Sequence, residues 1–282
     1  MNILILDILT DDCSVRRADR SLFPEVGGYA GMLRACAQRY ESEYIDAGLS
    51  GQGELEAVLR KVSLRRYAGI IIGGSATSIT AHDALQPWQT TVLSIIRCAW
   101  KLGIPTLGLC GGHQYGARAL SEHPDAVQRN PLGRNMGSSP LWLTRLGKEH
   151  FIFRGITNRT SFQWSHMCIV NRSLKKHEDF SVLASHPMCW CAAFQSRSFI
   201  GLQCHPEVAV EQMRYGADFI TRLASHRIPA LQKEGFFAGK DGFVRFMRED
   251  VAPAPGSHLV VQNWVAHVEM VTKLSFWCKI RV

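Results

Sequence analysis

The first half of the chain alternates short apolar runs with segments in which apolar residues recur every three or four positions. Segments with this periodicity predict helices, and short uninterrupted apolar runs predict buried strands. Nearly all-apolar strands separated by helices are typical of a parallel sheet that is covered on both faces. In chain order we expect a strand at 2–7, a helix at 29–40, a strand at 43–47, a helix at 55–64, a strand at 68–72, a helix at 87–102 and a strand at 106–109.

After about residue 140 the pattern changes to short apolar runs separated by polar turns, which is typical of antiparallel pairing. A mixed sheet within an α/β fold accommodates both halves of the chain. Helical periodicity returns at 208–223 and at 260–271, whereas 273–282 alternates like a strand. The short runs that we expect to pair are 141–144, 162–170, 181–185, 191–195 and 199–203.

The composition is that of a folded protein with a sizeable core. Of the 282 residues, 46% are apolar and 20% are charged, which excludes a disordered chain and a small disulfide scaffold. The length fits one large domain with an appendage. We expect a main domain at 1–230 and a C-terminal extension at 231–282. The extension should be partly helical and pack on the core or on a partner.

The formal net charge is 32 − 24 = +8. The basic residues lie in three scattered groups, around Arg16, Arg60 and Arg172, without interleaved aromatic residues. Such groups indicate a solvated surface with a weak attraction for anions, so we expect no nucleic-acid partner.

No apolar run approaches the ~20 residues that a membrane-spanning helix needs, and the first residues lack the basic region of a secretory signal. We therefore expect a cytoplasmic protein that does not contact a membrane. The nine cysteines are irregularly spaced, which favours reduced thiols over a disulfide framework. Cys189 and Cys191 have no matching second pair at zinc-ligand spacing, so we expect no metal.

One cysteine stands out by its neighbours. The segment Gly108-Leu-Cys-Gly-Gly-His-Gln114 lies where a predicted buried strand ends and a helix should begin. A nucleophile on such a sharp turn is held clear of the sheet, and flanking glycines permit a close backbone approach. Amides at the start of the helix favour a thiolate and can hold an oxyanion. Cys110 is therefore a candidate nucleophile, although the same residues also fit a buried thiol beside a structural turn.

A cysteine nucleophile needs a nearby base. His205 and Glu207 project to the same side of an extended chain, and Pro206 biases His205 toward that conformation. Glu207 can then orient the imidazole so that its other nitrogen faces Cys110, as in a Cys-His-Glu triad. A surface turn is the alternative interpretation of these residues. Rival bases, which lack a carboxylate two positions further on, are His113, His166 and His186.

With two further motifs, these segments resemble the class I glutamine amidotransferase family, in particular stand-alone proteins similar to the amidotransferase domain of GMP synthase. The resemblance extends from about Asn2 to about Leu223. It implies a flavodoxin-like three-layer α/β sandwich with a mostly parallel central sheet, helices on both faces and a smaller antiparallel sheet. The motifs, in order, are Ile70-Ile-Ile-Gly-Gly74, the G-x-C-x-G-x-Q elbow at 108–114, Trp164-Ser-His166 and Gln203-Cys-His-Pro-Glu207.

The resemblance implies a glutaminase reaction without a cofactor. Cys110 would attack the side-chain amide of glutamine, and His205, held by Glu207, would act first as base and then as acid. Water would hydrolyse the resulting γ-glutamyl thioester. The backbone amides of Gly74 and Gly111 would form the oxyanion hole. The positions that line the glutamine pocket in the family, partly through main-chain atoms, are Gln114, Ser165 and His166.

The sequence departs from the family pattern at Ser75, Asn135 and Cys204, where relatives commonly have proline, glutamate and an aromatic residue. No phosphate-cradling glycine loop is present, and the roughly sixty residues after Leu223 are too few for a synthetase domain. We therefore expect a separate synthetase to activate the ammonia acceptor. Two alternatives stay open: a γ-glutamyl peptide or conjugate hydrolase with the same triad, and a noncatalytic binding or regulatory subunit.

Overall fold

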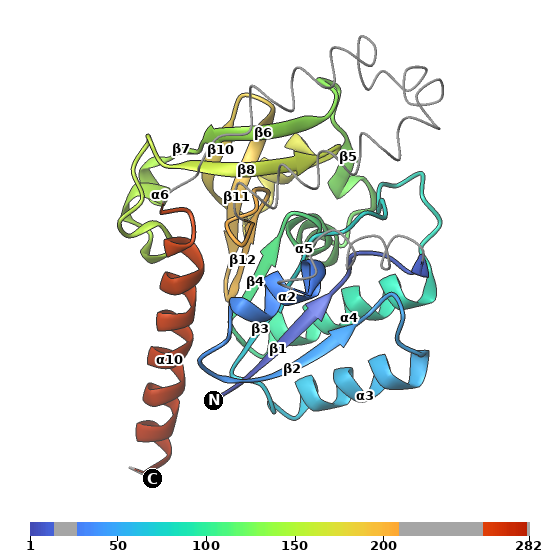
Figure 1. The fold of residues 1–282 in the computed structure, drawn as a ribbon, viewed down its shortest axis with the longest axis vertical. Coiled ribbons are helices and arrows are strands. Elements are labelled where there is room, and N and C mark those ends of the chain that lie inside the picture. The colour runs from blue at the N-terminus through green and yellow to red at the C-terminus, as the bar shows by residue number, and fades with distance from the viewer. Residues whose placement is uncertain (14–26, 209–255, 281–282) are drawn as a thin grey trace.

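The computed structural model describes residues 1–13, 27–208 and 256–280, with side chains as far as residue 274. One mixed sheet of eight strands forms its centre (Figure 1). Its strands are β1 (Asn2–Asp7), β2 (Glu41–Asp46), β3 (Gly69–Ile72), β4 (Thr106–Leu109), β7 (Trp142–Leu143), β10 (Ser181–His186), β11 (Cys189–Ser196) and β12 (Phe199–Leu202).

The strands lie in the order β2-β1-β3-β4-β12-β11-β10-β7. Neighbours from β2 to β12 pair in parallel, and neighbours from β12 to β7 pair antiparallel. The antiparallel pairs of this sheet all join strands that come after residue 140, where the apolar pattern of the sequence changes. The predicted α/β fold with a mixed, mostly parallel central sheet is confirmed.

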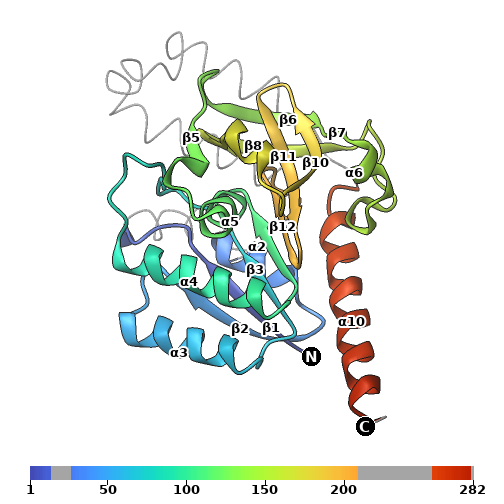
Figure 2. The same ribbon diagram turned by 180° about the vertical axis from the view of Figure 1, so that it is seen from behind.

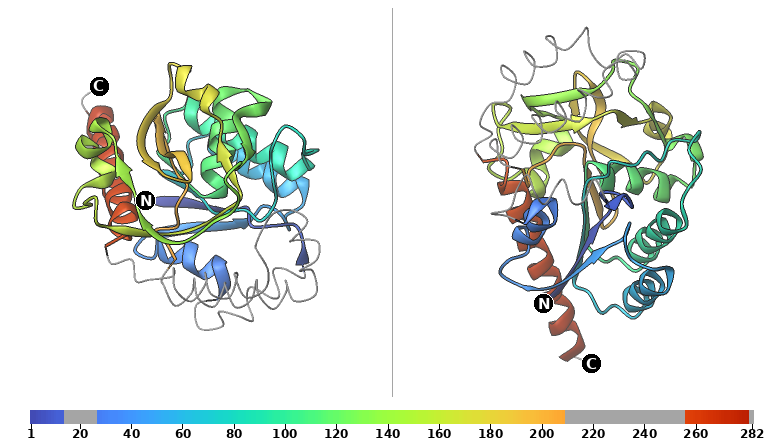
Figure 3. Two further views of the ribbon diagram at one scale, coloured as in Figure 1. Left: turned by 90° about the horizontal axis from the view of Figure 1, so that it is seen from above. Right: turned by 45° about the vertical axis from the view of Figure 1, so that its right-hand side comes forward.

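Helices cover both faces of this sheet (Figure 2). Alternate residues of β1 belong to two separate cores, because side chains of a strand point to opposite faces. Leu4 and Leu6 share one core with α3, α4 and α5, whereas Ile3 and Ile5 share the other with α2 and α10. Figure 3 shows these two groups of helices on opposite sides of the sheet. The helices are α2 (Gly28–Ala35), α3 (Gln52–Ser63), α4 (Pro87–Lys101), α5 (Gly111–Ser121), α6 (Arg145–Glu149) and α10 (Leu259–Ile280), with 3₁₀ turns η1 (Pro124–Ala126), η2 (Phe151–Phe153) and η3 (Arg172–Lys176).

Two small antiparallel sheets lie beside the carboxyl ends of the parallel strands (Figure 1). One pairs β5 (Val127–Arg129) with β9 (Cys168–Val170), and the other pairs β6 (Asn135–Pro140) with β8 (Ser161–His166). The run at 162–170, expected as one strand, is therefore two strands in different sheets. Neither β5 nor β6 was predicted, since each is short or rich in residues of low strand propensity.

The long helix α10 packs against the sheet face that carries Ile3 and Ile5. Val260, Trp264 and Val268, one helical turn apart, are fully buried. The expected strand character of 273–282 is wrong, because α10 continues to Ile280. This segment has no glycine or proline to stop a helix that has already begun, and each added residue gains a backbone hydrogen bond.

Other expectations meet the structure only in part. The helix expected at 29–40 ends at Ala35, and turns follow it as far as Tyr40. The helix expected at 208–223 and the domain boundary near residue 230 lie outside the described residues. Within the described ranges no helix is long and apolar enough to cross a membrane. The eight cysteines whose side chains the structure describes have free thiols.

Candidate active site

Cys110 lies between the end of β4 and the start of α5. Its backbone has φ 47° and ψ −96°, and residues with a side chain rarely adopt such a positive φ. Its N–H donates to Leu202 O at 2.7 Å, which ties the turn to the neighbouring strand β12. The surroundings thus hold a strained residue in place, as at the nucleophile elbow of α/β enzymes.

Glycines allow the loop after β3 to approach this elbow. A Cβ added at Gly111 would lie 2.3 Å from Ser75 N, and one added at Gly112 would lie 2.4 Å from Ile72 O. The N–H of Gly112 donates to Gly73 O at 2.8 Å. Two segments that are far apart in sequence are thereby packed backbone to backbone beside Cys110.

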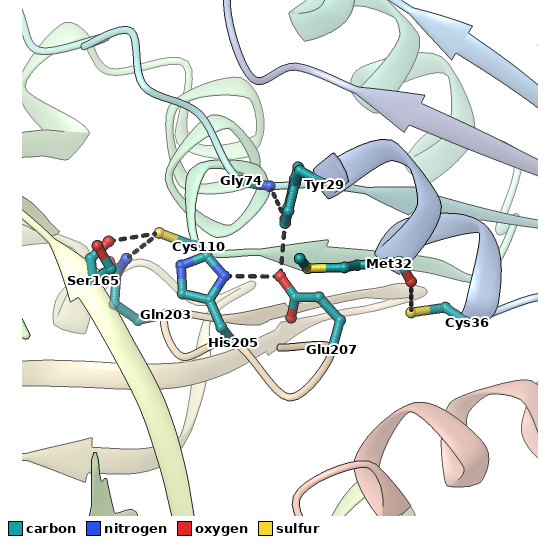
Figure 4. A network of polar contacts seen from close by, with 9 residues as sticks. All are labelled: Tyr29, Met32, Cys36, Gly74, Cys110, Ser165, Gln203, His205 and Glu207. Carbon is teal, nitrogen blue, oxygen red and sulfur yellow. Dashed lines mark hydrogen bonds and ion pairs between the residues drawn. The ribbon is translucent and has the colours of Figure 1, made fainter. Parts of the chain in front are cut away.

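His205 and Glu207 follow β12 and face the elbow. His205 Nδ1 lies 2.8 Å from Glu207 Oε1, and the backbone N–H of His205 donates to Gln163 O at 2.8 Å. The carboxylate side chain of Glu207 is fully buried. Figure 4 shows the imidazole between the sulfur of Cys110 and the carboxylate of Glu207. The structure therefore brings the three candidate triad residues into one row.

The charged groups on either side of the His205 imidazole determine the direction in which its pKa shifts. Burial by itself would lower the pKa of His205, but the negative charge of Cys110, when its sulfur is ionised, and that of Glu207 oppose it, as do hydrogen bonds to both groups. These interactions prevail and raise the pKa of His205 well above its usual value. The ring can therefore keep a proton at neutral pH and give it to a leaving group.

Three groups surround the sulfur. The thiol of Cys110 donates to Ser165 O, and the side-chain amide of Gln203 donates to the sulfur, both at 3.6 Å (Figure 4). The Arg134 guanidinium is buried nearby and donates to Ser165 Oγ at 3.1 Å. Burial lowers the pKa of Arg134, and the negative charge of Cys110 acts in the opposite direction. The Gln203 amide and the Arg134 guanidinium thus place a hydrogen-bond donor and a cation near the sulfur.

The three predicted pocket residues have different surroundings. The backbone carbonyl of Ser165 reaches Cys110, as just described. Gln114 donates to Cys168 O at 2.9 Å and to Gln203 Oε1 at 3.3 Å, so its side chain supports the groups around the sulfur. The ring of His166 lies 3.0 Å from the Asn135 amide nitrogen, and burial lowers its pKa to about 3. Both ring nitrogens of His166 have polar neighbours, since Nδ1 lies 3.1 Å from Cys168 O.

The two predicted oxyanion amides also differ. Gly111 is the first residue of α5, where a backbone N–H has no acceptor within the helix. The N–H of Gly74 donates to the Tyr29 hydroxyl at 2.6 Å, and that hydroxyl donates to Glu207 Oε1 at 2.8 Å (Figure 4). Sequence reasoning missed Tyr29, which it placed only as the first residue of a predicted helix.

Two of the rival bases, His113 and His186, pack against aromatic rings. The ring of His113 packs against Phe194 with centroids 5.0 Å apart, and that of His186 stacks on Trp164 at 4.3 Å. Among the described residues no cluster of three or more His, Cys, Asp or Glu side chains could hold a metal ion. Sequence reasoning also missed Gln203, which lay in a quoted motif without an assigned role, and Arg134.

Known proteins share both the sequence pattern and the fold. A sequence profile described as "Glutamine amidotransferase class-I" matches residues 53–221, more than half of the chain. The chain is 28% identical over 150 residues to the glutamine-hydrolyzing GMP synthase of Helicobacter pylori (strain HPAG1). The match covers 53% of this chain and 26% of that synthase, so the chain spans about a quarter of the relative's length.

Two solved structures share the fold over nearly the whole chain. A glutamine amidotransferase from Thermotoga maritima is 16% identical, with 95% of this chain and 97% of that chain covered at a TM-score of 0.58. A glutamine amido transferase from Methylobacillus flagellatus is 15% identical, with 94% of each chain covered at a TM-score of 0.55. At these identities the likeness concerns the fold alone.

The fold and the site together define an α/β protein with a cysteine at a strand–helix elbow and a histidine–glutamate pair facing it. The family profile matches residues 53–221, a range that includes Cys110, His205 and Glu207. The chain belongs to the class I glutamine amidotransferase family.

Proposed function

We propose that this chain is a glutaminase of the amidotransferase type, which hydrolyses the side-chain amide of glutamine and supplies ammonia to a biosynthetic acceptor. The observation that supports it best is the row formed by Cys110, His205 and Glu207, with the sulfur on a strained elbow and a buried carboxylate behind the imidazole. Each residue has the chemistry that its position in a nucleophile–base–orienter triad requires.

In the first half of the reaction His205 holds the proton of the Cys110 thiol, and the resulting thiolate attacks the side-chain carbonyl carbon of glutamine. The sulfur–carbon bond forms while the C=O electron pair moves to oxygen and gives an oxyanion. His205 then passes its proton to the amide nitrogen, and the carbon–nitrogen bond breaks to release ammonia. The product on the enzyme is a γ-glutamyl thioester. The raised pKa of His205 suits it to donate this proton.

In the second half, His205 takes a proton from water, whose oxygen attacks the thioester carbon. Collapse of the second oxyanion breaks the carbon–sulfur bond, releases glutamate and returns Cys110 with His205 protonated. Glutamine and water are thus converted to glutamate and ammonia. Throughout both halves Glu207 holds the ring through Nδ1, which leaves the other nitrogen toward the sulfur and the substrate.

Both halves pass through an oxyanion next to the sulfur. We assign its stabilisation to the backbone amides of Gly111, at the positive end of α5, and Gly74, in the loop packed against it. One such donor contributes about 2.7–4 kcal/mol to the stabilisation of the transition state. We further propose that the glutamine is bound next to Ser165, whose carbonyl is at the sulfur.

We place activation of the ammonia acceptor on a separate synthetase. The relative from Helicobacter pylori is named a glutamine-hydrolyzing GMP synthase, and the match covers only 26% of it. A partner that supplies the rest of such a reaction is therefore part of the proposal. Co-purification of a synthetase with the tagged chain, and stimulation of ammonia release by it, would support this part.

The decisive experiment measures ammonia and glutamate released from glutamine by the wild type and by Cys110→Ser. We expect equal amounts of both products and a loss of about 10³-fold or more in the variant. Cys98→Ser, which changes a half-buried thiol in α4, is the matched control and should keep full activity.

Amine release from γ-glutamyl conjugates without ammonia release from glutamine would indicate the hydrolase instead. No turnover of either substrate and no labelling of Cys110 by acivicin would indicate a noncatalytic subunit.

A further inference from the structure

Four groups at the site form one continuous chain of hydrogen bonds. The N–H of Gly74 donates to the Tyr29 hydroxyl at 2.6 Å, and this hydroxyl donates to Glu207 Oε1 at 2.8 Å. The same carboxylate oxygen lies 2.8 Å from His205 Nδ1. Tyr29, at the start of α2, therefore joins one of the two assigned oxyanion amides to the triad carboxylate (Figure 4).

A backbone amide has a single proton and makes one strong hydrogen bond at a time. While the N–H of Gly74 points at Tyr29, it cannot also stabilise an oxyanion beside Cys110. We propose that Tyr29 is a positioning residue that holds the Gly74 amide in a resting arrangement, and that turnover requires this one hydrogen bond to break. The inference rests on the proposed function, because it concerns the oxyanion of that reaction.

Release of Gly74 need not disturb the bond between Tyr29 and Glu207. The hydroxyl uses its lone pair toward Gly74 and its proton toward Glu207, so the two bonds are independent. The second carboxylate oxygen, Oε2, is buried without a hydrogen-bond partner among the described residues, and it offers an alternative acceptor if the hydroxyl moves. The hydroxyl stays protonated, since burial and the charge of Glu207 raise the pKa of Tyr29 well above its usual value.

The surroundings of α2 leave room for such a movement. Gly27 and Gly28, just before Tyr29, have φ of +73° and +71°, a conformation that glycine adopts without strain. On its other side α2 faces α10 across a cavity of about 580 Å³, and Glu207 is among the residues that line it. Tyr29 itself is buried in the core and does not line this cavity, so the freedom for a movement of α2 comes from the glycine pair and from the cavity beside Met32 and Cys36.

The contacts between α2 and the loop after β3 show which groups must separate when α2 moves. A Cβ added at Gly74 would lie 3.1 Å from the Tyr29 hydroxyl and 3.2 Å from His205 Cε1, so the loop fits closely against both rings. A Cβ added at Gly73 would lie 2.6 Å from Leu33 Cδ1. The loop is thus held by α2 through both Tyr29 and Leu33, and a small shift of α2 or rotation of the Gly74 peptide alters the direction of the amide.

The test is Tyr29→Phe, which removes the hydroxyl and keeps the ring. With the competing acceptor gone, we expect kcat for glutamine hydrolysis to rise about three- to tenfold, the size of effect that one ordinary hydrogen bond supports, with KM unchanged. Loss of the donor to Glu207 leaves more negative charge facing His205, so the alkaline limb of kcat/KM should move to higher pH. If Tyr29 had a purely structural role, Tyr29→Phe would neither raise kcat nor shift the alkaline limb of the kcat/KM profile.

The control is Tyr67→Phe, which removes another buried hydroxyl that donates to a carboxylate, Glu43 Oε2 at 2.8 Å, outside the site. It should leave kcat, KM and the pH profile unchanged. Thermal unfolding checks that both variants are folded. A kcat for Tyr29→Phe that equals or falls below that of the wild type overturns the inference.

Labelling with acivicin separates this inference from the proposed function. In its reaction with Cys110 the sulfur–carbon bond forms while the carbon–chlorine bond of acivicin breaks and chloride leaves. The reaction reports the nucleophile and the pocket, so we expect the same labelling rate in Tyr29→Phe and the wild type. If both are labelled and both hydrolyse glutamine, the ratio of their kcat values decides the inference. If neither is labelled and neither hydrolyses glutamine, the proposed function fails and the role of Tyr29 fails with it.

Discussion

At the scale of single residues, the absence of a side chain at Gly111 decides how closely the loop after β3 approaches Cys110. A Cβ there would lie 2.3 Å from Ser75 N and 2.9 Å from Gly74 C, and backbone atoms cannot yield as a flexible side chain can. The change Gly111→Ala therefore pushes away the loop that carries an assigned oxyanion donor. We expect kcat/KM for glutamine to fall about 10²-fold, since a displacement near 1 Å has that effect.

The control for that change is Gly53→Ala in the first turn of α3. A Cβ at Gly53 would meet nothing within 4 Å, so this variant should keep its activity and gain about 0.5–1 kcal/mol in free energy of unfolding. Steady-state kinetics and urea unfolding of both variants make the comparison. An active Gly111→Ala enzyme would show that the loop does not have to lie at the elbow.

Glu207 sets both the orientation and the charge of the imidazole. The change Glu207→Gln removes one of the two negative charges that raise the pKa of His205. The pKa of His205 should then fall, so the protonated ring is lost at lower pH and the alkaline limb of the pH–rate profile moves to lower pH. We also expect kcat to fall about 10²-fold or more, because the amide no longer holds one tautomer.

The control for Glu207→Gln is Glu43→Gln, which changes a hydrogen-bonded carboxylate at Tyr67, outside the site. Its pH–rate profile should match that of the wild type. A Glu207→Gln profile with an unmoved alkaline limb would contradict the assignment of that limb to His205.

Residue roles could be predicted where local sequence carries them. Cys110 and its glycines form one short segment, and Glu207 follows His205 by two positions, so the chemistry of each segment is readable from the sequence. Tyr29 and Glu207 are separated by 178 positions, and no local pattern indicates that they meet. Arg134 likewise reaches Ser165 only because β6 pairs with β8.

At the scale of elements, the strength of the apolar pattern decides what the sequence predicts. The strand at 106–109 agrees with β4, and the helix at 87–102 agrees with α4 to one residue. β6 contains Gly137 and Pro140 and has no strand pattern of its own, so it forms because β8 supplies a partner. The division between β8 and β9 depends on which partner each half finds, which an apolar run cannot reveal.

α10 offers a test of how an element outside the matched family region supports the fold. Trp264 is fully buried, and its ring would lie 3.0 Å from a Cβ at Gly69 in β3. Trp264→Ala therefore leaves a large cavity between α10 and the sheet, and we expect the free energy of unfolding to fall by about 3–5 kcal/mol. Met270→Ala, at a side chain that is 52% exposed on the same helix, should change it by about 0.5 kcal/mol or less.

Urea unfolding of the two α10 variants at constant pH measures this difference. Both should keep glutaminase activity under conditions in which they are folded, since neither residue contacts the row of Cys110, His205 and Glu207. Equal stability of Trp264→Ala and the wild type would show that α10 does not belong to the core in solution.

At the scale of the whole molecule, the order of strands places the site. The parallel strands β3 and β4 bring Gly74 and Cys110 to the same edge of the sheet, and β12, next to β4, delivers His205. The sequence predicts that these strands are parallel and buried. It does not determine that β12 lies beside β4, because that neighbour is chosen by pairing over nearly a hundred residues and follows only from the family resemblance.

Buried neutral histidines couple the stability of the whole molecule to pH. Burial lowers the pKa of His113 to about 4 and that of His166 to about 3, from about 6.5 in the unfolded chain. Protons therefore bind to the unfolded state first as the pH falls. The stabilisation is complete above pH 6.5 and is lost progressively toward the folded-state pKa, at about 1.4 kcal/mol per pH unit for each ring.

These two rings together predict a loss of about 3 kcal/mol per pH unit between roughly pH 6 and pH 4.5. The side chain of His113 is fully buried, and its ring packs on Phe194. His113→Gln removes one proton-binding group, so the slope should fall by about 1.4 kcal/mol per pH unit. Any general loss of packing in the variant lowers stability equally at every pH and does not alter the slope. Urea unfolding of wild type and variant across this range measures the slopes, and identical slopes would mean that the ring of His113 is accessible to protons in the folded protein.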